Sequence, residues 1–326
     1  MPSFVATALL FDRDQVDEVQ DWTERLDGLG RRSILWIDLD RVDRAQIEEI
    51  VEAFDLTAAS RERLIGDNTR PYFGDCGSYL HVTAFAPVRR NGQAESVKVD
   101  CLVSRHWVVT IHATPIEVFD DFRERVTASS GDIGRLDGPE FLADLLAWVL
   151  EAYLEEFEAI ELALEKFDER AMQDETDDAE SEIRRLVELR QQIGRLRRAL
   201  VSHRGMFLAL TRPELEAITS SDHAERFQLL RGQLEEVVQV ARDSRDAVFG
   251  SFDVLIARGE LRTNEVMKIL TLGALLFLPG ALIAGVLGMN FRIGLFETGW
   301  YFWVVCAAIV ALAVGTLVIA RVRDWI

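Results

Sequence analysis

The feature that most constrains this chain is a pair of long uncharged segments near its C-terminal end. No charged residue occurs in the 19 residues from Ile269 to Leu287 or in the 22 residues from Gly299 to Ala320. A helix of 19 residues is about 28 Å long, close to the thickness of the hydrocarbon core of a bilayer. The sequence therefore predicts two transmembrane helices in a C-terminal hairpin. The alternative, a buried pair of helices in a soluble domain, rarely contains two such segments.

The charges that flank these segments predict an orientation. The connector 288–299 holds Arg292 as its only basic residue, whereas both outer flanks are basic: Arg258, Arg262 and Lys268 precede the first segment, and Arg321 and Arg323 follow the second. The positive-inside rule places both termini in the cytoplasm and the connector outside, in a cytoplasmic (inner) membrane that the chain crosses twice. The N-terminus has no basic region before its short apolar stretch Phe4–Phe11, so a signal peptide is not expected.

The charge of the remaining chain excludes some functions. The sequence has 55 acidic and 36 basic residues, a formal net charge of -19, and residues 1–265 alone carry -21. Nucleic-acid binding needs an excess of Lys and Arg, so it is not expected, whereas cations are attracted. The three cysteines lie far apart and predict neither a disulfide framework nor a zinc finger. Neither a phosphate-binding loop nor a nucleophile elbow occurs, and the chain is not expected to be an enzyme.

The sequence outside the hairpin predicts two further regions, both cytosolic. Residues 1–137 form an α/β domain with strands over 33–39, 79–87, 96–103 and 107–112, helices over 44–54 and 116–127, and a hairpin turn at Asn91-Gly92. Residues 138–265 form long helices and a stalk, with one helix from about Gly138 and a second over 178–210. A third helix begins near Ser220 and continues into the first span, so that the membrane hairpin occupies 266–326. The expected class is α+β.

One stripe of the first span carries the most information. Spacings of three and four place the following residues on one helix face: Asn264, Met267, Thr271, Ala274, Leu278, Ala281, Gly285 and Gly288. If this stripe lines a pore, several copies must assemble around an axis, because one hairpin cannot enclose a pore. The alternative is that its small residues only let two helices pack closely. The residues themselves favour neither.

The segment Gly288-Met289-Asn290 ends this span. Gly288 allows a close backbone approach or a cap with positive φ. The Asn290 carbonyl can accept hydrogen bonds from the waters of a hydrated cation, which suits Mg²⁺ because that ion releases water reluctantly. On the stalk, Asp243, Asp246 and Asp253 fall on one helix face and are candidates for weak binding of divalent metal ions. Pairing with Arg242, Arg245 or basic residues of neighbouring helices is the equal alternative.

The C-terminal 65 residues resemble the CorA family of divalent-cation transporters. The resemblance is carried by TNEVMK at 263–268, Pro279 within FLPG, and GMNF at 288–291, and more weakly by WIDL at 36–39 and RPYF at 70–73. It implies a CorA-like funnel with a long stalk, a homopentamer and a central pore. In that pore Asn290 would select the cation, with Gly288 and Met289 shaping the filter, and Asp253 would lie near the cytosolic mouth. It also implies that six residues line the pore: Asn264, Met267, Leu270, Thr271, Leu278 and Ala281.

The sequence departs from the family pattern at three places. Leu287 replaces the usual Tyr before the GMN motif, residues 292–297 replace the usual M-P-E-L loop, and 226–233 contain no acidic residue where some relatives carry a sensing aspartate. The expected function is import of Mg²⁺, with Co²⁺ or Ni²⁺ also carried. The alternatives are a proton-coupled Zn²⁺ transporter like the ZntB branch and a membrane-anchored sensor that transports nothing. No cofactor is expected besides the transported cation.

Overall fold

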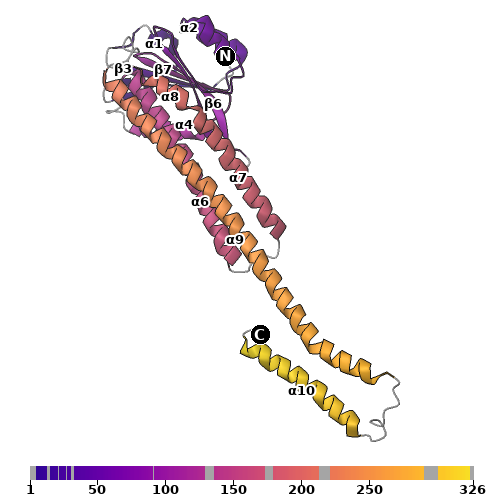
Figure 1. The fold of residues 1–326 in the computed structure, drawn as a ribbon. Helices are drawn as coiled ribbons and strands as arrows, with labels where there is room; N and C mark the ends of the chain where they lie inside the picture. The colour runs from indigo at the N-terminus through magenta and orange to yellow at the C-terminus, as the bar shows by residue number, and fades with distance from the viewer. Residues whose placement is uncertain are drawn as a thin grey trace. The chain divides into compact units, whose positions relative to one another are not determined.

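The computed structural model describes residues 5–12, 15–20, 22–26, 28–30, 33–90, 92–128, 136–172, 179–212, 221–289 and 300–323. The chain divides into two units, Met1–Phe252 and Asp253–Ile326. Helix α9 (Ser221–Leu287) contributes to both of them (Figure 1). The third predicted helix, which starts near Ser220 and continues through the first apolar segment, is therefore confirmed.

A seven-stranded sheet organises the first unit. Its order is β2-β1-β3-β7-β6-β5-β4, and within it only β3 and β7 pair in parallel. The strands are β1 (Val5–Asp12), β2 (Gln15–Glu18), β3 (Ser33–Asp40), β4 (Tyr72–Asp75), β5 (Leu80–Arg90), β6 (Gln93–Val103) and β7 (Trp107–His112). A mixed sheet combined with long helices confirms the predicted fold class.

The predicted hairpin turn connects β5 and β6. Arg90 pairs with Gln93, and Gly92 between them has a φ of +77°, whereas Asn91 lies outside the described residues. Only glycine reaches that region without a steric cost, which explains why the Asn-Gly pair signals this turn in the sequence. The four predicted strands correspond to β3, β5, β6 and β7.

Two short helices cover one face of the sheet. They are α2 (Arg44–Ala53) and α3 (Ala58–Ile65), while α1 (Trp22–Leu26) contributes partly buried residues to the same core. Helix α2 starts at a capping box in which Asp43 and Gln46 each accept a hydrogen bond from the other's backbone N–H. Alternate residues Leu35, Ile37 and Leu39 of β3 point into this core and are fully buried.

Helices α4 (Glu117–Ala128) and α6 (Gly138–Met172) pack on the opposite face. The Trp36 ring lies 5.6 Å from Phe122 of α4 and 5.4 Å from Phe141 of α6, centroid to centroid. Large aromatic side chains of this kind bury much apolar area, so they fix both helices against the sheet.

A buried polar network lies on the same face as Trp36. Asp38 accepts hydrogen bonds from Arg123 Nη2 at 2.9 Å and from Thr110 Oγ1, and His112 Nε2 lies 3.1 Å from its Oδ1. Burial alone would lower the pKa of His112, but the hydrogen bond and the charge of Asp38 outweigh burial and raise it. The network therefore links β3, β7 and α4 through paired charges, and His112 is a structural residue here.

The prediction of a single helix over 178–210 is wrong at one point. The structure has α7 (Ala179–Ser202) and α8 (Arg204–Leu210), separated at His203. His203 is buried; its Nδ1–H donates to the Ala199 carbonyl at 2.8 Å, and its Nε2 accepts from the Phe85 N–H at 2.9 Å. At this interruption the His203 ring is held between two backbone groups, a contact that helix periodicity does not reveal.

Two side chains provide hydrogen-bond partners for the part of β5 that β4 does not cover. Strand β4 pairs with β5 only from Leu80 to Thr83, so Phe85 lies beyond its reach. Its N–H donates to His203, and its carbonyl accepts from the Tyr153 hydroxyl at 3.0 Å. A buried backbone group without a partner costs about as much as a lost hydrogen bond, so these two side chains stabilise the end of β5.

Helix α6 also packs along α9 within the first unit. Ser244 of α9 is fully buried, and its hydroxyl lies 2.8 Å from Glu161 Oε1 of α6. Ser251, seven residues further along α9, is equally buried, but its hydroxyl has no partner among the described residues. The contact between α6 and α9 therefore contains a hydrogen-bonded hydroxyl at Ser244 and, two turns later, a buried hydroxyl without a described partner at Ser251.

Candidate functional site

The candidate site lies on the C-terminal part of α9, in the second unit. The helix contains Pro279 and ends at Leu287, where the Gly288 N–H donates to the Ala284 carbonyl at 2.9 Å. A proline inside a helix removes one backbone hydrogen bond, which membrane-spanning helices tolerate. Helix α10 (Trp300–Val322) lies alongside this part of α9 (Figure 1).

Both helices are long and apolar enough to cross a membrane. None of the residues in the most apolar 18-residue window of either helix is buried. Phe277 and Trp303, for example, expose 73% and 72% of their surface. Within this chain the two helices therefore do not form a buried core pair. Apolar surface of this extent needs lipid or other protein to cover it.

The six expected pore-lining residues are all exposed on α9: Asn264, Met267, Leu270, Thr271, Leu278 and Ala281. Asn264 and Met267 line the same shallow depression of the helix surface. The Thr271 hydroxyl donates to the Met267 carbonyl at 2.7 Å, which leaves its oxygen lone pairs free to accept. The stripe thus presents an amide, a thioether and a hydroxyl, and no charge.

The contact between α9 and α10 lies on the other side of α9. A Cβ atom placed on Gly280 would lie 3.2 Å from Ile309 Cγ2, so the helices approach closely there. At 3.6 residues per turn, Met267, Thr271 and Leu278 of the stripe lie about 140–180° around the helix from Gly280, and Ala281 lies about 100° from it. No atom lies within 4 Å of a Cβ built on Gly285, which belongs to the stripe. Packing within the hairpin therefore does not use the stripe.

Only part of the GMN motif lies within the described residues. Gly288 is not among the described glycines with positive φ. A Cβ on it would lie 3.1 Å from the Ala284 carbonyl oxygen, which is a tight contact. Met289 is exposed, and its N–H lies 3.3 Å from the Val286 carbonyl oxygen. Asn290 and the connector through Gly299 lie outside the described residues.

The three stalk aspartates are exposed on α9. Asp243 accepts a hydrogen bond from the Gln239 side chain at 2.8 Å. Among the described residues, none of the three forms an ion pair, including with Arg242 or Arg245. The local pairing that would have neutralised these carboxylates within one chain is therefore not seen.

One further group could offer ligands to a metal ion. In the described part of the chain, Asp137, Glu140 and His223 place one ligand atom each within 4.8 Å of one another. Asp137 and Glu140 already cap the start of α6 through each other's backbone N–H, and His223 Nε2 lies 3.0 Å from Asp137 Oδ2. The positive end of a helix and Arg226, 4.0 Å from Glu140, both oppose a cation at this position.

Sequence reasoning missed a second buried charge network. Asp100 accepts a hydrogen bond from Thr83 Oγ1 at 2.7 Å and forms an ion pair with Lys98 Nζ at 2.8 Å. His81 Nε2 lies 3.3 Å from Asp100 Oδ1. Lys98 also donates to carbonyls at the end of α3. The alternation of charged residues along β6 was the available signal, but it predicts a solvated strand face equally well.

Fold and site together define a protein with two helices that are candidates to span a membrane and a large unit built on a mixed sheet. A family model described as CorA-like Mg²⁺ transporter protein matches residues 31–321. The chain belongs to this CorA-like family, whose members are transporters and not enzymes.

Individual relatives agree with this membership. A cobalt/magnesium transport protein CorA from Thermotoga maritima is 25% identical over 299 residues, which cover 89% of this chain and 83% of the relative. The complete structure of a CorA magnesium transporter from Methanocaldococcus jannaschii covers 100% of both chains at a TM-score of 0.78 and 18% identity. The structure of the full-length CmaX protein covers 99% of this chain and 98% of its own, with a TM-score of 0.73 and 20% identity. The structural similarities establish a shared fold.

Proposed function

We propose that this chain carries divalent metal cations across the cytoplasmic membrane through a homopentameric, channel-like pore, with Mg²⁺ as its main cargo. The observation that carries the proposal is the family match, which extends through both apolar helices and includes the GMN motif. In this assembly the stripe of α9 lines the pore, because the opposite side of α9 is occupied by α10. Both termini lie in the cytoplasm.

The chemistry of the first span supports a hydrated, hard cation. Between Ile269 and Leu287 the sequence has no Cys, His or carboxylate, and Met267 supplies the one soft ligand of the stripe. Zn²⁺ stripped of water binds nitrogen and sulfur ligands, whereas hydrated Mg²⁺ needs only oriented oxygens around its waters. Asn290, at the outer end, supplies such an oxygen from each copy, and Asp243, Asp246 and Asp253 attract cations on the cytosolic side.

Transport by the purified full chain in liposomes tests the proposal. Mg²⁺, Co²⁺, Ni²⁺ and Zn²⁺ are offered separately, each with and without a pH gradient. Uptake of Mg²⁺ without a gradient is expected. Uptake of Zn²⁺ alone, dependent on the gradient, would favour the proton-coupled alternative, and no uptake of any cation would favour a sensor. Native mass spectrometry showing only monomer or dimer would contradict the pore.

The assignment of Asn290 has its own test. Asn290→Ala removes the carboxamide oxygen, so uptake is expected to be lost or strongly reduced while the oligomer stays intact. Glu297→Ala is the matched control in the same connector; its effect should be smaller, because Arg292 offsets its charge and salt screens it beyond about 8–10 Å. Normal transport by Asn290→Ala together with impaired transport by Glu297→Ala would show that the filter is elsewhere.

A further inference from the structure

One charged residue of α9 lies on the same helix face as the stripe that begins at Asn264. Five charged residues follow Asp253 on this helix: Arg258, Glu260, Arg262, Glu265 and Lys268. At 3.6 residues per turn, Glu260 lies about 20° around the helix from Met267, whereas the other four lie about 100–180° from it. Glu260 is therefore the charge of this segment that shares the face of the stripe, one turn or about 6 Å before Asn264.

The helix surface around Glu260 offers oxygen atoms of three kinds. Glu260, Thr263 and Asn264 line one shallow depression of α9, together with Ile256, Gly259 and Met267. The Thr263 hydroxyl donates to the Gly259 carbonyl at 2.8 Å, so its oxygen lone pairs remain able to accept. No atom lies within 4 Å of a Cβ built on Gly259, which leaves space beside the carboxylate. The depression therefore combines a carboxylate, a hydroxyl and an amide oxygen, the ligand types that hard cations and their bound waters take.

The charge of Glu260 is not offset within its own helix. The residues three and four positions away, which share its side of the helix, are all uncharged: Ile256, Ala257, Thr263 and Asn264. Among the described residues Glu260 forms no ion pair. Glu265, by contrast, has Arg262 and Lys268 three positions away on either side. The face of the stripe therefore carries a full negative charge at Glu260.

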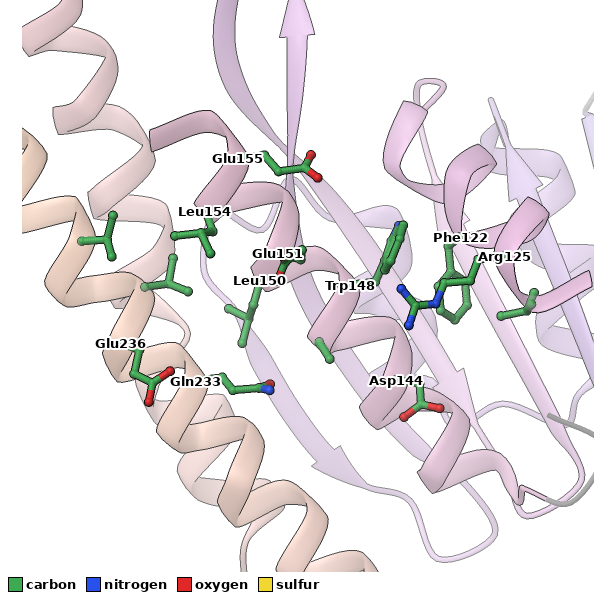
Figure 2. A pocket seen from close by; sticks show the side chains of 14 residues that line it. Phe122, Arg125, Asp144, Trp148, Leu150, Glu151, Leu154, Glu155, Gln233 and Glu236 are labelled. Atoms are coloured by element: carbon green, nitrogen blue, oxygen red, sulfur yellow. The ribbon is translucent and has the colours of Figure 1, made fainter. Parts of the chain in front are cut away.

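An exposed carboxylate alone would be weak evidence, because this chain has many of them. Four carboxylates line the groove between α4, α6 and α9 in the first unit (Figure 2): Asp144, Glu151, Glu155 and Glu236. Among the described residues, these four do not bring ligand atoms together around one point. Glu236 also lies about 140° around α9 from Met267, away from the stripe. Glu260 differs from these carboxylates because it lies on the stripe, where an assembly that encloses a pore brings its copies together.

We propose that Glu260 is a specificity-determining residue of the cation pathway, and that its carboxylates, one from each copy, form a ring at the cytosolic end of the pore. The inference rests on the proposed homopentameric pore, because only a symmetric assembly around the stripe brings the copies of Glu260 to one axis. Like charges around an axis repel one another, so a divalent cation at the centre is favoured over a monovalent one and anions are excluded. Thr263 and Asn264 accept hydrogen bonds from the waters of the same cation.

The initial rate of Mg²⁺ uptake by the full chain in liposomes tests the role of Glu260. At Mg²⁺ concentrations far below half-saturation and about 0.01 M ionic strength, Glu260→Gln should lower the rate about fivefold, the effect of one exposed charge pair. The loss should shrink at about 1 M ionic strength, because the Debye length falls from about 30 Å to about 3 Å. Glu260→Asp keeps the charge and should retain most of the rate. Glu236→Gln is the matched control: it removes the same charge from an exposed position of α9 away from the stripe, and its rate should equal that of the wild type.

Three outcomes would overturn the proposal while leaving the transport function intact. An unchanged rate for Glu260→Gln at low ionic strength would place this carboxylate outside the cation pathway. An equal fall for Glu236→Gln would show that only net charge matters. A fall that is the same at both ionic strengths and is not restored in Glu260→Asp, or a loss of the wild-type oligomer on gel filtration, would indicate a role in packing. The absence of uptake by the wild type would instead refute the proposed function, and the ring of Glu260 with it.

Discussion

The clearest quantitative prediction concerns His203 and acid stability. Burial lowers the pKa of His203 from 6.5 to about 4, so the folded protein holds a neutral ring. Its stabilising effect is fully present above pH 6.5 and is lost as the pH falls from 6.5 through about 4, because only the unfolded chain takes up the proton in that window. One pKa unit corresponds to about 1.4 kcal/mol, so the loss reaches about 3 kcal/mol at pH 4.

The variant His203→Gln isolates this effect. Glutamine stays neutral, and its side-chain oxygen can still accept from the Phe85 N–H. At pH 7.5 the variant should be less stable, because the ring contacts with Phe85, Tyr153 and Phe207 are lost. Between pH 6.5 and 4 the gap should close by about 3 kcal/mol, a change in relative Tm of about 6–12 °C for a unit of this size.

The assay is thermal unfolding of the full chain in detergent at half-unit steps from pH 7.5 to 4. Taking the difference between wild type and variant at each pH removes the contribution of the carboxylates that titrate in both. A difference that stays constant from pH 6.5 to 4 would refute the reasoning. It would mean either that His203 is protonated in the folded protein or that its hydrogen bond to Phe85 does not form.

Three further predictions can be checked by unfolding and assembly measurements. Asp38→Asn should destabilise the sheet domain by up to about 3 kcal/mol, because it removes the buried carboxylate shared by His112 and Arg123, while Arg123 keeps Asp120 at 2.7 Å and His112 keeps Asp40 at 3.5 Å. It should also reduce the stability that His112, with its raised pKa, adds below pH 6.5 and loses as the pH rises through that pKa. Gly280→Leu should disrupt the α9–α10 contact and shift the detergent-solubilised oligomer on gel filtration, whereas Gly273→Leu, with no atom within 4 Å of its Cβ position, should not. Ser251→Ala should be neutral or stabilising by up to about 1 kcal/mol in chemical denaturation, because it removes a buried hydroxyl without a partner; a loss above about 1 kcal/mol would show that Ser251 does have one.

The sequence by itself determined the elements that depend only on the residues within them. Uncharged segments long enough to cross a bilayer predicted the two apolar helices, because length and hydropathy need no partner to be recognised. Asn91-Gly92 predicted the β5–β6 turn, since the backbone conformation at Gly92 is a property of that residue. The spacing from Asn264 to Gly288 likewise defined a helix stripe, although it left pore lining and helix packing equally open.

Only the tertiary structure decided the features that depend on contacts between distant residues. His203, which lies between α7 and α8, meets Phe85, 118 positions earlier in the chain. The contact between Gly280 and Ile309 of α10 shows which side of α9 packs within the hairpin, and the stripe residues are exposed. Among the described residues, Glu156 and Glu235 have arginine partners, whereas Glu151 and Glu236 form no ion pair, although all four are exposed or partly exposed glutamates on helices. Helix periodicity specifies which side chains share a face. Which other element packs against that face depends on tertiary contacts between residues far apart in the sequence, and no local pattern connects those residues.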